Sequence, residues 1–167
     1  MRDPRFIAAH RGGPLDLASH RLAVQWAADC AERVLPFFQQ HSDDIRPLQA
    51  IKIARQWAKG DVKTGDAMKA SVAAHAAARV VTDKAAIAAA RAAGQAVATA
   101  HFADHCMGGL LYALKALEAN GQPSDGELAF RLAKLPEHLR ATVAEGLPFR
   151  IKGLGIRARL TETRDVR

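Results

Sequence analysis

Residues 85–117 read AAIAAARAAGQAVATAHFADHCMGGLLYALKAL, and this stretch decides the fold. Alanine is the strongest helix former and a poor strand former, so the composition of the stretch predicts a helix. Thr82 and Asp83 provide an N-terminal cap before it, and the run Asn120-Gly121-Gln122-Pro123 ends it. We therefore predict one long Ala/Gly-rich helix, the fourth along the chain, over about residues 82–119.

The middle of this predicted helix is almost free of charge. Between Ala92 and Leu114, Asp104 is the one residue that is Asp, Glu, Lys or Arg. Charged side chains are costly to bury, so a helix with so little charge belongs at the centre of the fold. Gly94 and the pair Gly108-Gly109 lie inside the helix, and they leave a kink or a break as an open alternative.

The rest of the chain also predicts helices. Of the 167 residues, 36 are alanine and 5% are aromatic, which argues against a β-sandwich, a barrel or a large α/β enzyme. We predict an all-α, single-domain bundle of five or six helices around the long fourth one, after an irregular segment at residues 1–18. The other helices are expected at about 19–40, 47–59, 64–81, from 124 onward and at 137–145, with no helical period from Leu147.

The charge of the chain is positive and unevenly distributed. Lys and Arg number 24 against 17 Asp and Glu, a net charge of +7. Residues 150–167 hold six basic and two acidic side chains, and we interpret them as a basic tail after a helical domain at 1–149. Such a tail can bind an acidic partner, a membrane or nucleic acid, although a solvated end is the simpler interpretation. It has no aromatic side chain on which bases could stack, so nucleic acid is not an expected partner.

Three features predict a cytoplasmic protein with no membrane contact. The N-terminal stretch MRDPRFIAAHRGG has no apolar signal-peptide core. The longest uncharged run in the middle of the chain, residues 92–103, is too short to span a bilayer. Cys30 and Cys106, the two cysteines, make neither a disulfide framework nor a zinc-finger spacing.

The polar residues of the predicted central helix are the candidates for function. His101 and His105 are four residues apart and share one helical face. That face lets another helix pack very closely, with the imidazoles bonded to its polar groups, or it borders a small pocket. The residues on the same face are Gly94, Ala98, Gly108 and Tyr112, with Asp104 beside them.

A metal site is one alternative for these residues. His101 and His105, with Asp104, have a spacing that a divalent transition metal such as zinc could use. The set lacks the Glu of a HExxH motif, and His75 in the preceding predicted helix is the natural third ligand. A metal-binding protein or a hydrolase acting through metal-bound water is therefore the alternative function. Otherwise we expect no cofactor and no catalytic residue, and Tyr112 could join a polar network.

Two further pairs of polar residues lie one helical turn apart. Asp29 and Arg33 form a surface ion pair in the simpler interpretation, and a polar clamp toward the third or fourth helix in the sharper one. His75 and Arg79 are expected to flank a helix interface. Alanine-rich faces suit packing between chains as well as within one, so a homo-oligomer is left open.

A series of motifs runs through residues 3–145. It comprises DPRF (3–6), RGG (11–13), HRL (20–22), WAADCAERVLPFF (26–38), AI-x-x-A-R-x-W-x-x-G (50–60), AHAAAR (74–79), ARAAGQAVATAHFADH (90–105), YALKA (112–116) and LAKLPEHLR (132–140). The series resembles a bacterial family, the immunity-five-like helical proteins of polymorphic toxin systems.

The resemblance implies an all-α immunity protein that binds a cognate toxin and neutralises it by direct protein–protein contact. It supplies no catalytic residues to carry over. Because this chain is basic, the toxin surface should be acidic or the contact apolar. The polar residues that fall within the family's motifs are His20, Asp29, Arg33 and Arg79, together with the histidine-rich set His75, His101, Asp104 and His105.

Overall fold

The computed structural model describes residues 3–158, and these residues form helices joined by turns. Two short 3-10 helices, η1 (Pro4–Phe6) and η2 (Ala9–Arg11), precede seven α-helices in this part of the chain. The predicted all-α fold is therefore confirmed, while the expected number of five or six helices is wrong. The α-helices are α1 (Leu17–Gln39), α2 (Arg46–Lys59), α3 (Thr64–Ala78), α4 (Lys84–Ala98), α5 (His105–Ala119), α6 (Asp125–Ala133) and α7 (Glu137–Ile151).

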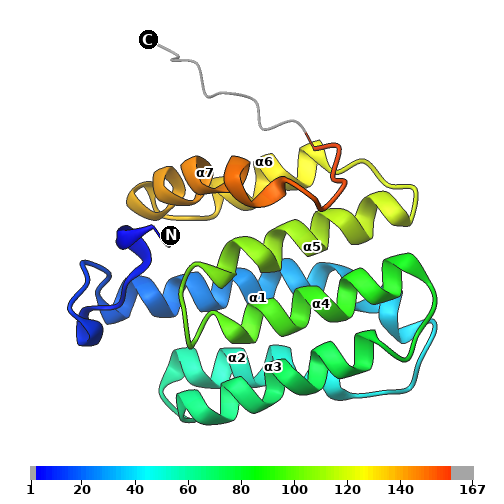
Figure 1. Ribbon diagram of the computed structural model, residues 1–167, viewed down its shortest axis with the longest axis horizontal. Helices are drawn as coiled ribbons and strands as arrows, with labels where there is room; N and C mark the ends of the chain where they lie inside the picture. Colours follow the sequence, from blue (N-terminus) through cyan, green and yellow to red (C-terminus); the bar gives the residue numbers. More distant parts are fainter. Residues whose placement is uncertain (1–2, 159–167) are drawn as a thin grey trace.

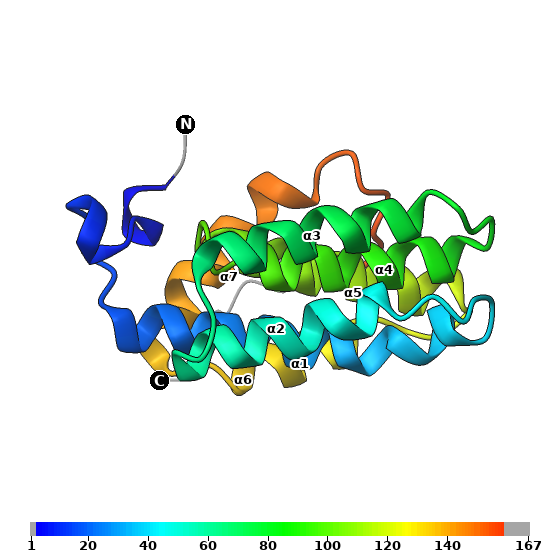
Figure 2. The same cartoon turned by 90° about the horizontal axis from the view of Figure 1, so that it is seen from below.

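Helix α4 lies at the centre of the bundle and packs against α1, α2, α3 and α5 (Figure 1). Helices α6 and α7 lie on the outer side of α5, and α2 with α3 lie on the opposite side of α1 and α4. The N-terminal segment that contains η1 and η2 lies at one end of the bundle (Figures 1 and 2). Its neighbour there is the turn between α4 and α5.

The central position of α4 follows from its small side chains. Its ten buried residues are all alanine, glycine or valine. Such a surface has no large side chain to hold neighbours away, so four helices can approach one backbone closely. The bulk of the core comes from the neighbouring helices, through residues such as Phe38, Leu110, Leu114 and Leu117.

The predicted long fourth helix is two helices, because the chain turns at residues 99–104. No glycine or proline stands in this turn. Contacts from other elements stabilise it instead. His20 of α1 donates from Nε2 to the Thr99 carbonyl oxygen at 2.7 Å, and Arg150 of α7 forms an ion pair with Asp104. The expectation of one continuous helix is therefore wrong. Of the alternatives left open, a kink or a break, the structure has a break, which lies between Gly94 and Gly108.

The end of α7 also differs from expectation. The predicted loss of helical period at Leu147 is wrong, because α7 continues to Ile151 with Pro148 inside it. Leu139, Val143, Leu147 and Ile151 are spaced by four residues and form its inner stripe. Residues 152–158 then pass over α5, where the Glu118 carboxylate accepts hydrogen bonds from the backbone N–H groups of Arg157 and Ala158.

Half of the predicted basic tail, residues 159–167, lies outside the described residues. The described helices include none with the length and apolar character needed to cross a membrane.

Both cysteines are buried in the core, and they lead to a simple prediction. Burial raises the pKa of the Cys106 thiol to about 12 and that of Cys30 well above its usual value. The thiolate is the reactive form, so both groups should be inert in the folded protein. We expect no reaction with Ellman's reagent at pH 8, and two equivalents per chain after denaturation in urea. Rapid labelling of the folded protein would contradict the buried placement.

Candidate functional site

His75 lies directly against Gly94, where α3 crosses α4. A Cβ placed on Gly94 would come within 2.8 Å of the His75 Nε2 atom, so the imidazole occupies the space that any larger residue would need. Ser71, one turn earlier on α3, donates from Oγ to the Gly94 carbonyl oxygen at 2.9 Å. The predicted glycine face is thus filled by a side chain of α3 at this point.

The same arrangement recurs between α4 and α5. His105 donates from Nδ1 to the Oε1 atom of Gln95 at 2.8 Å. A Cβ on Gly108 would lie 2.5 Å from that Oε1 atom, so the Gln95 side chain fills the space beside Gly108. We call these five residues, namely His75, Gly94, Gln95, His105 and Gly108, the glycine–histidine seam. Close packing describes this face at Gly94, whereas Gln95 and Gly108 also line a surface hollow together with Tyr112.

The seam predicts the effect of adding one methyl group. Gly94→Ala should lower the free energy of unfolding by about 1–2 kcal/mol, since the His75 ring must shift out of a packed position. Gly65→Ala, near the start of α3, is the matched control because nothing lies within 4 Å of its Cβ. Urea unfolding of both variants measures the difference. In the double variant, His75→Ala should remove most of the loss in unfolding free energy that Gly94→Ala causes. If the two losses simply add, the contact between His75 and Gly94 is contradicted.

Two histidines are held neutral by burial. Burial lowers the pKa of His75, with the cations Arg91 and Arg79 and also His105 acting in the same direction. Burial likewise lowers the pKa of His20, although the Thr99 carbonyl partly opposes it. Among residues 3–158 the buried Nδ1 of His75 has no hydrogen-bond partner, so a proton there would be unsatisfied.

These shifts predict a loss of stability in mild acid. Above about pH 6.5, the ordinary histidine pKa, the folded and unfolded chains both hold these rings neutral. Below it the unfolded chain takes up protons that the folded chain does not, so the free energy of unfolding falls with pH. Urea unfolding at pH 7.5 and pH 5.5 should show this fall. His75→Gln should make the dependence shallower, and an unchanged slope would contradict the assignment to His75.

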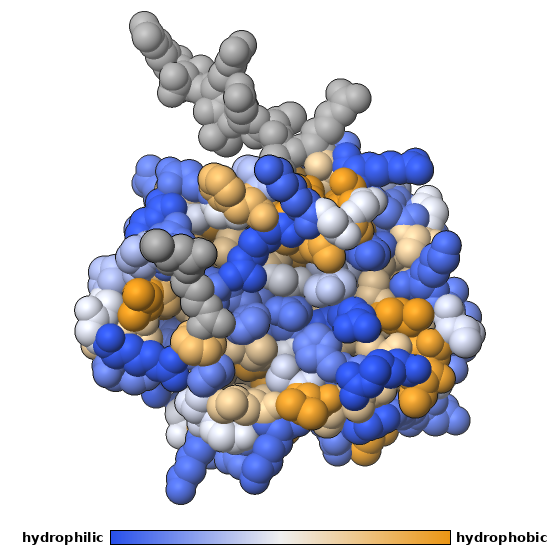
Figure 3. All heavy atoms as spheres, in the orientation of Figure 1, coloured by the Kyte–Doolittle hydropathy of each residue, from blue (hydrophilic) through white to orange (hydrophobic). Residues whose placement is uncertain are grey.

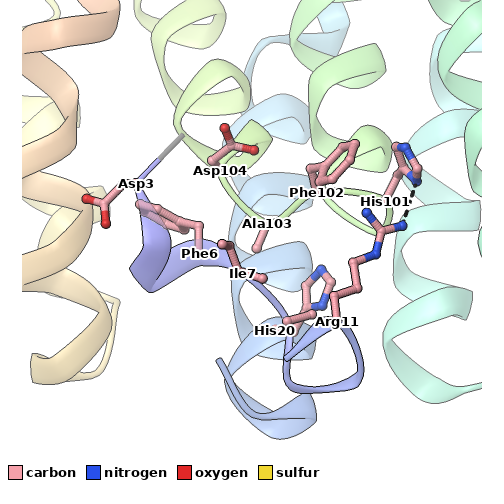
Figure 4. A pocket seen from close by; sticks show the side chains of 10 residues that line it. Asp3, Phe6, Ile7, Arg11, His20, His101, Phe102, Ala103 and Asp104 are labelled. Atoms are coloured by element: carbon pink, nitrogen blue, oxygen red, sulfur yellow. Dashed lines mark hydrogen bonds between the residues drawn. The ribbon is translucent and has the colours of Figure 1, made fainter. Parts of the chain in front are cut away.

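His101 faces away from the seam, toward the N-terminal segment. Arg11 donates from Nη2 to the His101 Nδ1 atom at 3.5 Å, and its guanidinium lies 4.6 Å from the centre of the Phe102 ring. Figure 4 shows Arg11 and His101 at the edge of a cavity between the N-terminal segment and the α4–α5 turn. The volume of this cavity is about 190 Å³. His20 and Asp104 also line this cavity. The volume is below the usual range for a pocket that binds a drug-sized ligand.

Asp104 and Tyr112 lie apart from the seam histidines. The Asp104 side chain is 4% exposed and forms its ion pair with Arg150, which is 35% exposed. Tyr112 borders a second, more open hollow with Gln95. The candidate residues of the sequence analysis therefore lie in two places: around the cavity, and along the seam with the hollow that Gln95 and Gly108 of the seam help to line.

The predicted metal ligands His75, His101 and His105 are not grouped. Within residues 3–158 no three His, Cys, Asp or Glu side chains come together in a way that could hold a metal ion. Two of the histidines are in the seam, and His101 contacts Arg11. The donor set required for the metal alternative does not fit this part of the chain, and zinc remains an untested prediction.

Asp29 and Arg33 each have an ion-pair partner on another helix. Asp29 contacts Arg55 of α2 at 2.7 Å, and Arg33 lies 3.9 Å from Glu127 of α6, so the expected Asp29–Arg33 pair is wrong. These ion pairs are exposed at one or both partners and contribute little to stability. Arg79 is an exposed residue at the C-terminal end of α3. Arg11, Arg55 and Arg150 are the contacting residues that the sequence analysis missed.

Comparison with known proteins identifies the family. The model of a family described as "Imm-5 like putative immunity protein" matches residues 13–138. The match covers most of the chain, including α1 to α6, and the chain therefore belongs to this family of immunity proteins. No curated protein and no solved structure matches the chain.

Proposed function

We propose that the protein is a cytoplasmic immunity protein that binds a cognate bacterial toxin and neutralises it by direct contact. The observation that carries the proposal is the family match over residues 13–138. Immunity by contact requires a surface complementary to the toxin and no chemistry of its own.

The positions of the polar residues support binding over catalysis. A catalytic site needs an acid, a base or a nucleophile that converge on one accessible point. Here His75 and His105 serve helix packing, and Asp104 is held by Arg150. The residues that a catalytic hypothesis would use are thus in separate structural contacts.

The surface offers both apolar and electrostatic contacts for toxin binding. Met68, Val72 and Val80, on α3 and just after it, are 44%, 68% and 70% exposed. Figure 3 shows apolar side chains over α3 and the α3–α4 connection, beside a mainly hydrophilic centre. Clustered exposed apolar side chains commonly mark protein interfaces. The net charge of +7 adds a preference for an acidic partner surface.

Co-expression tests the proposal. The protein is produced together with the product of the neighbouring gene, and growth rescue is scored alongside co-purification. We expect rescue and a stable complex with the wild-type chain and also with the His101→Ala/His105→Ala variant, since neither histidine needs to bind a metal. Rescue without any complex would overturn direct contact. Loss of rescue in a folded double variant, together with loss of bound metal, would favour the metal-dependent alternative.

A further inference from the structure

The hollow beside Gln95 and Tyr112 is a groove of about 290 Å³ between α4, α5 and the segment that follows α7. We call it the α5–α7 groove. One wall is made by Gln95 and Tyr112, and the other by Arg150, Lys152 and Gly153. Among the described residues, its lining includes two cations and no carboxylate. The groove therefore has the chemistry to receive an anionic group.

The two walls differ in origin. Gln95 and Tyr112 belong to helices inside the family match, which ends at residue 138. Arg150 to Leu154 lie beyond it. Gly153 and Gly155 have positive φ angles of 85° and 67°, which turn the chain back over α5 after Lys152. One wall of the groove therefore lies within the region that the family model matches, and the other lies outside it.

The Arg150 side chain is held in place before any partner arrives. Its ion pair with the buried Asp104 fixes the guanidinium beside the groove. A guanidinium has five N–H donors in a planar fork, and a carboxylate on Asp104 cannot use them all. Lys152 is exposed and adds a mobile positive charge on the same wall. A preorganised arginine beside a lysine is a favourable arrangement for binding a carboxylate.

We propose that the α5–α7 groove is the docking point for an acidic segment of the toxin, with a carboxylate bound by Lys152 and Arg150. The proposal rests on the proposed function and specifies the chemistry of the partner. On the opposite wall of the groove, Gln95 and Tyr112 contribute an amide and a hydroxyl group that can hydrogen-bond to the same segment. Because one wall lies outside the family match, it selects the particular toxin that this chain recognises.

The first test uses a defined probe and requires no toxin. A hexaglutamate peptide is titrated at low salt into the ¹⁵N-labelled full chain, with hexaglutamine as the neutral control. We expect amide shifts at Gln95, Tyr112, Lys152 and Gly153 with hexaglutamate, and none with hexaglutamine. Lys152→Glu should weaken binding about ten-fold or more, since it reverses a charge in the groove. The matched Lys52→Glu, exposed on α2, should change the affinity less than three-fold.

The second test uses the toxin. If the wild-type chain binds the neighbouring gene product, Lys152→Glu should weaken that complex far more than Lys52→Glu. Equal effects of the two variants would overturn the groove assignment and leave direct binding intact. Failure of wild-type binding, with the peptide result unchanged, would overturn the proposed function instead. Tighter binding of a six-nucleotide oligothymidylate than of hexaglutamate in the groove would overturn the acidic-segment assignment in favour of phosphate.

Discussion

Arg150→Met is expected to lower the free energy of unfolding by about 2–3 kcal/mol, because it removes the cation paired with a buried carboxylate. The Asp104 side chain is 4% exposed, at the turn between α4 and α5. Methionine preserves much of the packing volume of the arginine stem, so the loss reports the ion pair. Chemical unfolding at pH 7 gives the measurement.

Two comparisons isolate this contribution. Arg79→Met, at an exposed arginine on α3, should change stability by less than about 0.5 kcal/mol. Asp104→Asn combined with Arg150→Met completes a double-mutant cycle, and the cost of the double change should be well below the sum of the single costs. Additive costs would show that the two side chains act independently and would contradict the pairing.

Ala89→Leu is expected to have the larger effect, a loss of about 3 kcal/mol or failure to fold, because overpacking a dense core displaces whole helices. Ala89 has no exposed surface and lies on α4, which packs against four other helices. Leucine adds three carbon atoms at a position that has no exposed surface. Circular dichroism during thermal unfolding follows the change.

An exposed alanine provides the matched control. Ala129→Leu, on the outer face of α6, makes the same chemical change at an exposed position. It should alter the free energy of unfolding by less than about 0.5 kcal/mol. If Ala89→Leu were tolerated as well as Ala129→Leu, the close approach of helices to α4 would be wrong.

Local signals were sufficient for several helix ends. Helix α2 ends at Lys59 as predicted, where Gly60 follows with a φ of 91°, and Asp83 caps α4 by accepting from the Ala86 backbone N–H. The first helix begins at Leu17, two residues before its predicted start at about residue 19, because Asp16 caps it. Asp16 and Ser19 are both good capping residues, and only the fold decides between them.

The break at residues 99–104 could not be predicted from local sequence. Ala100, Phe102 and Ala103 are compatible with a helix, and the expected breakers at Gly94 and Gly108 lie within regular helices. The turn depends on contacts that are distant in sequence. His20 is 79 residues from Thr99, and Arg150 is 46 residues from Asp104. Such long-range contacts override helix propensity, and one sequence gives no sign of them.

The candidate site could be predicted only in part, because its geometry depends on the same break between α4 and α5. Helical spacing correctly indicated a face of glycines and histidines, but it assumed one continuous helix. Since the chain turns before Asp104, His101 and His105 lie on different elements and face different neighbours. The four-residue spacing along α7, from Leu139 to Ile151, was a signal in the sequence that would have extended that helix.

We propose that the protein acts by binding its toxin and that His75 and His105 serve helix packing. Calorimetric titration of the purified neighbouring gene product with the wild-type chain and with the His101→Ala/His105→Ala variant, each with and without EDTA, tests this. We expect a tight complex of fixed stoichiometry under all four conditions, with affinities that agree within about three-fold. No binding by the wild-type chain, or binding that EDTA abolishes, would contradict it.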